Sequence, residues 1–125
     1  MAEDNTFDLE NRLIEFAVRI IRMAESLPET KVANHISGQL IRCGTSPAPN
    51  YGEAQSAESR ADFIHKMKVC LKELRETRVW LLMIVRAKLI KPVSKLNSLI
   101  QESNELISIF VTSIRTAKKA EKKSP

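Results

Sequence analysis

Four stretches of the sequence place their apolar residues at steps of three and four, and this spacing constrains the fold more than any other feature. An α-helix repeats every 3.6 residues, so such spacing puts the apolar side chains of each stretch on one side of a helix. The stretches cover residues 9–27, 32–54, 59–89 and 92–117. Because no strand-like alternation accompanies them, the four helices are predicted to bury their apolar sides against one another.

Residues at the ends of these stretches predict where each helix starts or stops. Pro28 ends the first stretch, and Thr30 follows as a candidate N-terminal cap for the second. Ser59 and Asp62 have the spacing of a capping box at the start of the third, with aspartate in place of the usual glutamate. Pro92 suits the first turn of the fourth helix. The connections are short, which favours antiparallel neighbours.

The second stretch contains the strongest helix-breaking signal in the chain. Its apolar stripe continues regularly to Cys43 and then meets Gly44, Pro47 and Pro49. Each proline removes one intrahelical hydrogen bond and clashes with the preceding turn, so we expect a kink or short break between Gly44 and Asn50. We therefore predict an all-α protein, an antiparallel up-down-up-down four-helix bundle whose second helix is kinked near Pro47 and Pro49.

The length of the chain bounds its domain organisation. A chain of 125 residues fits one domain with its own core, and residues 1–117 are predicted to form the bundle. Residues 118–125 lack apolar periodicity and contain four lysines, so we expect a basic, flexible C-terminal tail. The longest apolar run, residues 79–85, has seven residues, far fewer than the roughly 20 that a membrane-spanning helix needs.

The third stretch sorts its side chains into three faces. A basic face carries lysines and arginines, and a second face carries Val69 and Trp80 among charged residues. An apolar surface with a charged border is typical of a subunit interface, so Val69 and Trp80 are candidate interface residues; alternatively, Trp80 packs against the kinked second helix of its own chain. The core face is a heptad-spaced stripe of Phe63, Met67, Cys70, Leu74, Thr77, Leu81 and Ile84.

Polar residues interrupt the apolar stripe late in the second stretch. Asn50 and Glu53 stand where the stripe would continue, and buried polar groups need partners. Lys66, Glu73 and Glu76 of the third helix are available as partners. We interpret these five residues as a structural polar network that fixes the register of the two helices, with a ligand site as the alternative.

Positive charge is concentrated in the second half of the chain. Residues 1–58 contain five basic and nine acidic residues, residues 59–91 contain nine and three, and residues 92–125 contain six and three. Such asymmetry is typical of a surface for a polyanion such as RNA, or for an acidic partner protein, and also of a merely solvated surface. The candidate nucleic-acid-binding residues are Lys68, Lys72, Arg75, Arg86, Arg115, Lys118, Lys119, Lys122 and Lys123.

Catalytic and metal-binding motifs are not evident. A di-iron bundle uses two Glu-x-x-His motifs, and only Asp62-x-x-His65 comes near that pattern. No nucleophile is accompanied by a base and an orienting acid. Cys43 and Cys70 belong to no CxxC pair, so we expect reduced thiols in a cytoplasmic protein. We predict a protein without enzymatic activity, cofactor or metal.

Several ordered motifs resemble a known bacterial family. They include Phe16-Ala17, Ser26-Leu27-Pro28, QLIRCGTS at residues 39–46, Asn50 with Glu53-Ala54, ADFIHK at residues 61–66, KELRET at residues 72–77, and Trp80-Leu81-Leu82. Over residues 9–90 the chain resembles the four-helix-bundle proteins first known from intervening sequences in large-subunit ribosomal RNA genes. The fourth helix is similar only in being amphipathic, and Pro49 stands where the family usually has alanine.

The resemblance implies a helical bundle that assembles into pentameric rings. It also implies kinship with the accessory protein of diversity-generating retroelements, a basic pentamer that binds reverse transcriptase and nucleic acid. From these expectations we form two hypotheses. In the first, a non-enzymatic homo-oligomer binds RNA, or an RNA-associated protein such as a reverse transcriptase, through its basic faces. In the second, the same faces make a protein-interaction scaffold that does not contact nucleic acid.

Overall fold

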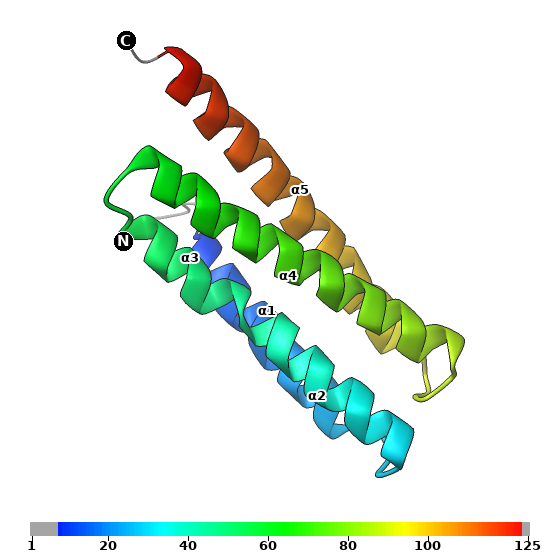
Figure 1. Cartoon of the computed structure of the whole chain (residues 1–125). Coiled ribbons are helices and arrows are strands. Elements are labelled where there is room, and N and C mark those ends of the chain that lie inside the picture. Colours follow the sequence, from blue (N-terminus) through cyan, green and yellow to red (C-terminus); the bar gives the residue numbers. More distant parts are fainter. Residues whose placement is uncertain (1–7, 124–125) are drawn as a thin grey trace, which may run out of the picture.

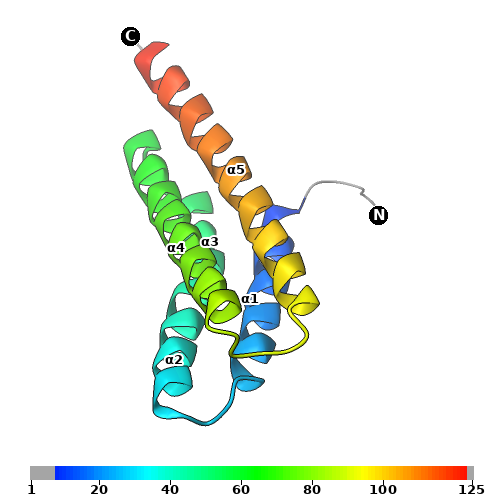
Figure 2. The ribbon, with the colours of Figure 1, turned by 90° about the vertical axis from the view of Figure 1, so that its right-hand side faces the viewer.

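The chain folds into antiparallel helical rods (Figures 1 and 2). The structure is a computed structural model, and it describes residues 8–123 except the side chain of Lys123. The elements are α1 (Leu9–Glu25), α2 (Lys31–Thr45), α3 (Pro47–Gln55), α4 (Arg60–Arg86) and α5 (Ser94–Lys123). α3 continues the direction of α2, so the two helices together make one of the four rods of the bundle. The predicted all-α four-helix bundle is confirmed.

Side-chain caps set the start of three helices. Asp8 accepts a hydrogen bond from the Asn11 backbone N–H of α1 at 3.0 Å. Thr30 accepts one from the Ala33 backbone N–H of α2 at 3.1 Å, and Ser59 accepts one from the backbone N–H of Asp62 in α4 at 3.0 Å. Each cap satisfies a backbone donor that the first turn of a helix leaves without a partner. The predicted caps Thr30 and Ser59 are confirmed.

The second rod bends at its prolines without leaving the helical region. Ser46 ends α2 and precedes α3, with φ −71° and ψ −38°, which are helical angles. Pro47 and Pro49 cannot donate backbone hydrogen bonds, and the regular ladder resumes where the Asn50 backbone N–H donates to the Ser46 carbonyl at 3.2 Å. The predicted kink near Pro47 and Pro49 is therefore confirmed as a bend in a continuous rod.

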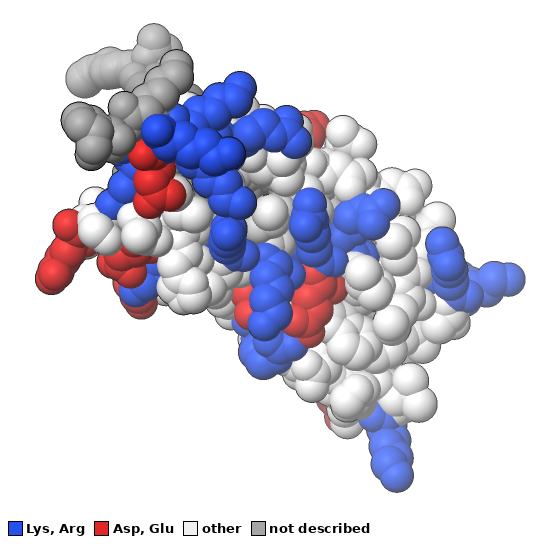
Figure 3. All heavy atoms as spheres, turned by 45° about the horizontal axis from the view of Figure 1, so that its top comes forward, with Lys and Arg blue, Asp and Glu red and all other residues white. Residues whose placement is uncertain are grey.

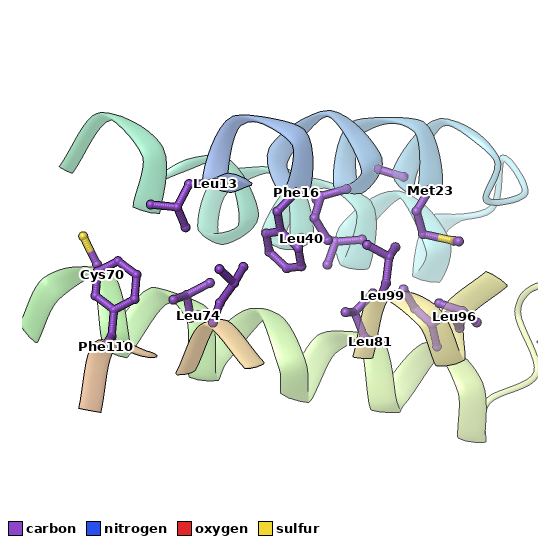
Figure 4. Close-up of a cluster of buried hydrophobic side chains, with 14 of the residues drawn as sticks. Leu13, Phe16, Met23, Leu40, Cys70, Leu74, Leu81, Leu96, Leu99 and Phe110 are labelled. Atoms are coloured by element: carbon purple, nitrogen blue, oxygen red, sulfur yellow. The ribbon is translucent and has the colours of Figure 1, made fainter. Parts of the chain in front are cut away.

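The core runs along the axis of the bundle and draws on every rod (Figure 4). Phe16 and Ile20 of α1, Leu40 of α2 and Phe110 of α5 are all at most 1% exposed. The predicted stripe of α4 is buried from its second residue to its last, whereas its first residue, Phe63, is only partly buried. At that level the buried neighbour Ile64 belongs to the core, and Phe63 packs against it.

The helix ends around the last connection differ from the predicted boundaries. α4 ends at Arg86 because Lys88 adopts a left-handed conformation with φ 54°. The Lys88 and Leu89 backbone N–H groups then donate to the carbonyls of Val85 and Ile84, both at 3.1 Å. These two bonds define a Schellman motif, which stops a helix by satisfying its last carbonyl groups. α5 starts at Ser94, two residues after the predicted Pro92.

The C-terminal end of α5 also differs from the prediction. The bundle was expected to end at residue 117 and a flexible tail to cover residues 118–125. α5 remains helical through Lys123, and residues 124–125 lie outside the described residues. Alanine, lysine and glutamate, which dominate this segment, have high helix propensity, and a helix that is already formed extends at little cost. The end of α5 therefore projects beyond the start of α4 in both ribbon views (Figures 1 and 2).

Candidate nucleic-acid interface

A basic groove lies between α4 and the C-terminal half of α5. Arg75 of α4 and Arg115 and Lys118 of α5 line it, and it has a volume of about 220 Å³. Its apolar floor is formed by Leu71, Val111 and Ile114. We call this the α4/α5 groove. Lysine and arginine side chains gather on this side of the molecule, over α4 and the end of α5 (Figure 3).

Lys68 extends the positive charge of the α4/α5 groove. The nearby Lys68 ammonium group lowers the pKa of Lys118, because a second positive charge disfavours the charged form of the first. Among the described residues, no ion pair involves Lys68, Lys118, Arg75 or Arg115. The groove is thus a concentration of cations that form no ion pairs, and Glu121 offsets only part of the repulsion that lowers the pKa of Lys118.

The structure separates the remaining candidate residues from one another. Lys72 lies on the exposed side of α4 between Lys68 and Arg75, and Lys119 and Lys122 are exposed on the projecting part of α5. Arg86 is eleven residues beyond Arg75 and therefore about 16 Å further along the helix axis. It occupies the last turn of α4, outside the groove. The side chain of Lys123 lies outside the described residues.

The residues assigned to a polar network form two groups instead of one. Lys66 donates to Glu53 at 2.9 Å, and this hydrogen bond raises the pKa of Lys66. Glu73 and Glu76 are paired with Arg42 of α2. Both groups connect the second rod to α4, so each of them helps to fix the register of these two rods.

Two details of these polar contacts were not foreseen. Asn50 donates within its own rod, to the carbonyl and hydroxyl oxygens of Ser46 at 3.0 and 2.8 Å, and it does not join either group. Arg42, which holds Glu73 and Glu76, was not proposed as a partner. Its signal is visible in the sequence, because Arg42 follows Gln39 by three residues and both therefore share one face of α2; Gln39 accepts from Arg42 at 3.0 Å.

Trp80 lies half-buried against the second rod of its own chain. Its indole N–H donates to Glu76 at 3.0 Å, and its ring meets the ring of His35 edge-on, with centroids 6.0 Å apart. Val69 is also partly exposed. Next to Trp80, the side chains of Val79 and Met83 are 46% and 44% exposed. The intrachain packing weighed for Trp80 therefore coexists with an exposed apolar surface on α4.

Residues 8–123 show neither a cluster of metal ligands nor an activated cysteine. No three His, Cys, Asp or Glu side chains within this range lie close enough together to hold a metal ion. Burial raises the pKa of Cys70 to about 12, and burial also raises the pKa of Cys43, so neither thiol is activated as a nucleophile. None of the described helices combines the length and the apolar character that crossing a membrane requires.

A second set of charged residues, at the seam between α1 and α5, was not singled out from the sequence. Arg12 donates to Glu102 at 2.7 and 2.9 Å and to Glu105 at 2.6 Å. Farther along the seam, Arg19 donates to the hydroxyl of Ser98 at 2.6 Å. The signal that was available is the heptad spacing of Arg12 and Arg19.

The fold and its surfaces place the protein in the class of basic four-helix bundles with a cationic groove between two helices. The chain belongs to the family of 23S rRNA-intervening sequence proteins, whose family model matches residues 6–112. It is similar to a crystal structure of a protein of unknown function from the S23 ribosomal protein family of Bacteroides thetaiotaomicron. The two chains are 34% identical with a TM-score of 0.79, over 86% of this chain and 98% of that one. No curated protein matches the chain.

Proposed function

We propose that this protein is a non-enzymatic homo-oligomer that binds RNA phosphates through the α4/α5 groove of each subunit. The observation that carries the proposal is the convergence of Arg75, Arg115 and Lys118 on one groove, with no carboxylate in an ion pair with any of them among residues 8–123. Like charges that lie close to one another cost free energy in the unbound protein. A phosphate among them removes that cost and gains charge-assisted hydrogen bonds.

The chemistry of the groove supports recognition of the backbone and not of the bases. Its polar lining consists of cations, and its apolar lining consists of the aliphatic residues Leu71, Val111 and Ile114. Aromatic residues make up only 5% of the chain, which leaves few platforms for base stacking. The proposed complex therefore has little sequence preference and weakens steeply as salt is raised.

A charge-reversal experiment tests this function. Arg75→Glu combined with Lys118→Glu places two carboxylates in the groove, and both residues are exposed, so folding should be preserved. The matched control is Lys31→Glu with Lys91→Glu, which makes the same charge change at exposed positions away from the groove. Affinity for a labelled structured RNA is measured by fluorescence anisotropy between about 50 and 300 mM salt, a range over which the log affinity of a phosphate-binding protein falls linearly with log salt.

The two hypotheses differ in the expected result. If the groove binds phosphates, the groove variant binds RNA more weakly. The negative slope of log affinity against log salt also becomes shallower, by about 0.7–0.9 for each phosphate that the variant no longer neutralises. The control keeps most of its affinity and slope. An equal decrease in both variants would indicate only a net-charge effect. Unchanged RNA affinity in the groove variant would favour the protein-interaction scaffold, with an acidic or reverse-transcriptase-like protein as the partner of the groove.

The proposed assembly uses the apolar surface around Trp80. Val79 and Met83 of α4 are about half exposed, and Val32 of α2 is 61% exposed. The pairing of His35 with Trp80 and of Arg42 with Glu76 sets an antiparallel register that brings Val32 level with Met83. An apolar surface with a charged border fits a second copy of the chain. Five copies in a ring is the number that the family resemblance implies.

Solution mass tests this assembly. We expect the unaltered protein to have the mass of an oligomer in light scattering, and Met83→Lys to shift it toward the monomer. Ile14→Lys is the matched control, because Ile14 on α1 is 43% exposed and Met83 is 44% exposed. A monomeric unaltered protein would exclude the homo-oligomer. A lower mass in the Ile14 variant alone would place the interface on α1.

We also propose that the protein works in the cytoplasm. The support is the state of its two cysteines, which are both free and both buried in the core. Free buried thiols are typical of reducing compartments.

A further inference from the structure

A second groove lies at the opposite seam of the bundle, between the end of α1 and the start of α5. Its volume is about 330 Å³, within the range of small-molecule sites. Arg19, Arg22 and Lys95 line it, and Met23 and Leu99 form its apolar floor. We call this the α1/α5 groove. Figure 2 shows the two helix segments that meet there, the second half of α1 and the first turns of α5.

Helical spacing explains why these side chains converge. Arg19, Arg22 and Met23 are three and four residues apart, which places them on one face of α1. Lys95 and Leu99 are four residues apart on α5. The hydrogen bond from Arg19 to the Ser98 hydroxyl, at 2.6 Å, joins the two faces. The convergence is thus a product of the antiparallel register of α1 and α5.

Elsewhere on the same seam, an arginine of α1 has the acidic partners that this groove lacks. Arg12 lies one heptad before Arg19, and it is held by Glu102 and Glu105 of α5. One heptad before those two carboxylates on α5 stand Lys95 and Ser98. The arginine is therefore repeated along α1, whereas its two carboxylate partners on α5 are replaced by a cation and a hydroxyl.

The positive charge of the α1/α5 groove is not offset within the described chain. Among residues 8–123, Arg19, Arg22 and Lys95 have no carboxylate within ion-pair distance. The C-terminus of α1 and the N-terminus of α5 meet here, so their helix dipoles oppose each other and the side chains determine the local potential. Two serine hydroxyls, those of Ser26 and Ser98, add hydrogen-bonding groups to the lining.

We propose that the α1/α5 groove binds a small phosphomonoester with an apolar body. A phosphate carries close to two negative charges and three acceptor oxygens, which suits three cations better than a carboxylate does. The phosphate lies among Arg19, Arg22 and Lys95, where the heptad repeat provides no carboxylate. The apolar body covers Met23 and Leu99. This site is separate from the α4/α5 groove, and it does not depend on RNA binding.

Isothermal titration with three probes tests the ligand class. The probes are phenyl phosphate, inorganic phosphate and phenol, used with the full chain at low chloride. We expect phenyl phosphate to bind roughly tenfold or more tightly than either of the other two, since only it reaches both the cations and the apolar floor. No binding of phenyl phosphate, or equal binding of phenyl phosphate and inorganic phosphate, overturns the proposal.

Lys95→Glu is the most specific variant for this site. It restores the carboxylate that the seam has at Glu102, so it should pair with Arg19, raise the melting temperature, and weaken phenyl phosphate binding roughly tenfold or more. Arg22→Gln, at an exposed position, should weaken the binding without raising the melting temperature. Unchanged binding in both variants overturns the proposal, whatever happens to the melting temperature.

Lys72→Gln separates this site from the proposed RNA surface. Lys72 lies beside the α4/α5 groove, so its replacement should lower RNA affinity and leave phenyl phosphate binding unchanged. Arg22→Gln should do the reverse. If Arg22→Gln weakens RNA binding and not phenyl phosphate binding, the α1/α5 groove is a contact for the RNA backbone, and the small-ligand proposal is overturned.

Discussion

Gly44 of α2 lies directly against Ile20 of α1, so close that a Cβ atom on Gly44 would be 2.7 Å from Cγ2 of Ile20. Both residues are buried. Glycine is costly inside a helix, because it loses more conformational freedom on folding than other residues. Its place here is explained by the close approach of the two helices, which any side chain would obstruct.

Gly44→Ala should therefore destabilise the protein. We expect the free energy of unfolding to fall by about 1–2 kcal/mol, as overpacking of roughly 1–3 kcal/mol outweighs the better helix propensity of alanine. Gly38→Ala is the matched control, since a Cβ there meets nothing within 4 Å, and it should gain about 0.5–1 kcal/mol. Urea unfolding measures both. Stabilisation by both substitutions would mean that the helices are not in close contact at Gly44.

Lys88→Gly should stabilise the end of α4. Lys88 has φ 54°, a conformation in which most side chains are strained and glycine is not. Removing that strain should add about 0.5–1 kcal/mol to the free energy of unfolding. Ala87→Gly, at the preceding residue with φ −83°, should instead lower it by a similar amount. Thermal unfolding of the two variants should move the melting temperature in opposite directions.

The contribution of Glu105 to stability should depend on pH. Hydrogen bonds from Gln101 and then from Arg12 lower the pKa of Glu105 below its usual 4.5. A carboxylate whose pKa is lower in the folded state stabilises that state above the unfolded pKa, and this contribution is lost as the pH falls through the folded pKa. Glu105→Gln should thus lower the melting temperature at pH 7, and lower it less at an acidic pH well below the usual pKa. An equal effect at both values would rule out the charge as its cause.

The two thiols should be unreactive in the native protein. Cys43 and Cys70 are both buried and their pKa values are raised by burial, so at pH 8 the thiolate of Cys70, with a pKa of about 12, is a very minor species. A disulfide exchange reagent such as Ellman's reagent should react with neither cysteine until guanidinium is added, and then with both. Rapid labelling of either one without denaturant would show that its rod opens easily.

Local patterns in the sequence predicted most of the fold correctly. The apolar spacing identified the four rods, and Thr30 and Ser59 cap the helices that they were expected to cap. Boundaries without a strong local signal were less accurate. Lys88 gives no hint in the sequence that it adopts a left-handed conformation, and the alanine and lysine residues after Thr116 extend α5 without any apolar periodicity.

The candidate site depended more on tertiary structure. Composition indicated that α4 and α5 are basic, but only the packing of the two helices brings Lys118 to Lys68 and excludes Arg86. The same holds at the α1 seam. The equivalence of Lys95 and Glu102 is a matter of heptad spacing, yet it acquires meaning only when Arg12 and Arg19 are seen to face α5.

The bend at Pro47 and Pro49 has a consequence for how the molecule opens. Neither proline has a backbone N–H, so the hydrogen-bond ladder that couples α2 to α3 is interrupted at both of them, and it resumes where the Asn50 N–H donates to the Ser46 carbonyl. Cooperative opening follows continuous hydrogen-bonded segments, and α3 has only nine residues. The amide protons of α3 should therefore exchange with solvent sooner than those of α2, as a small unit that opens while the rest of the bundle stays closed.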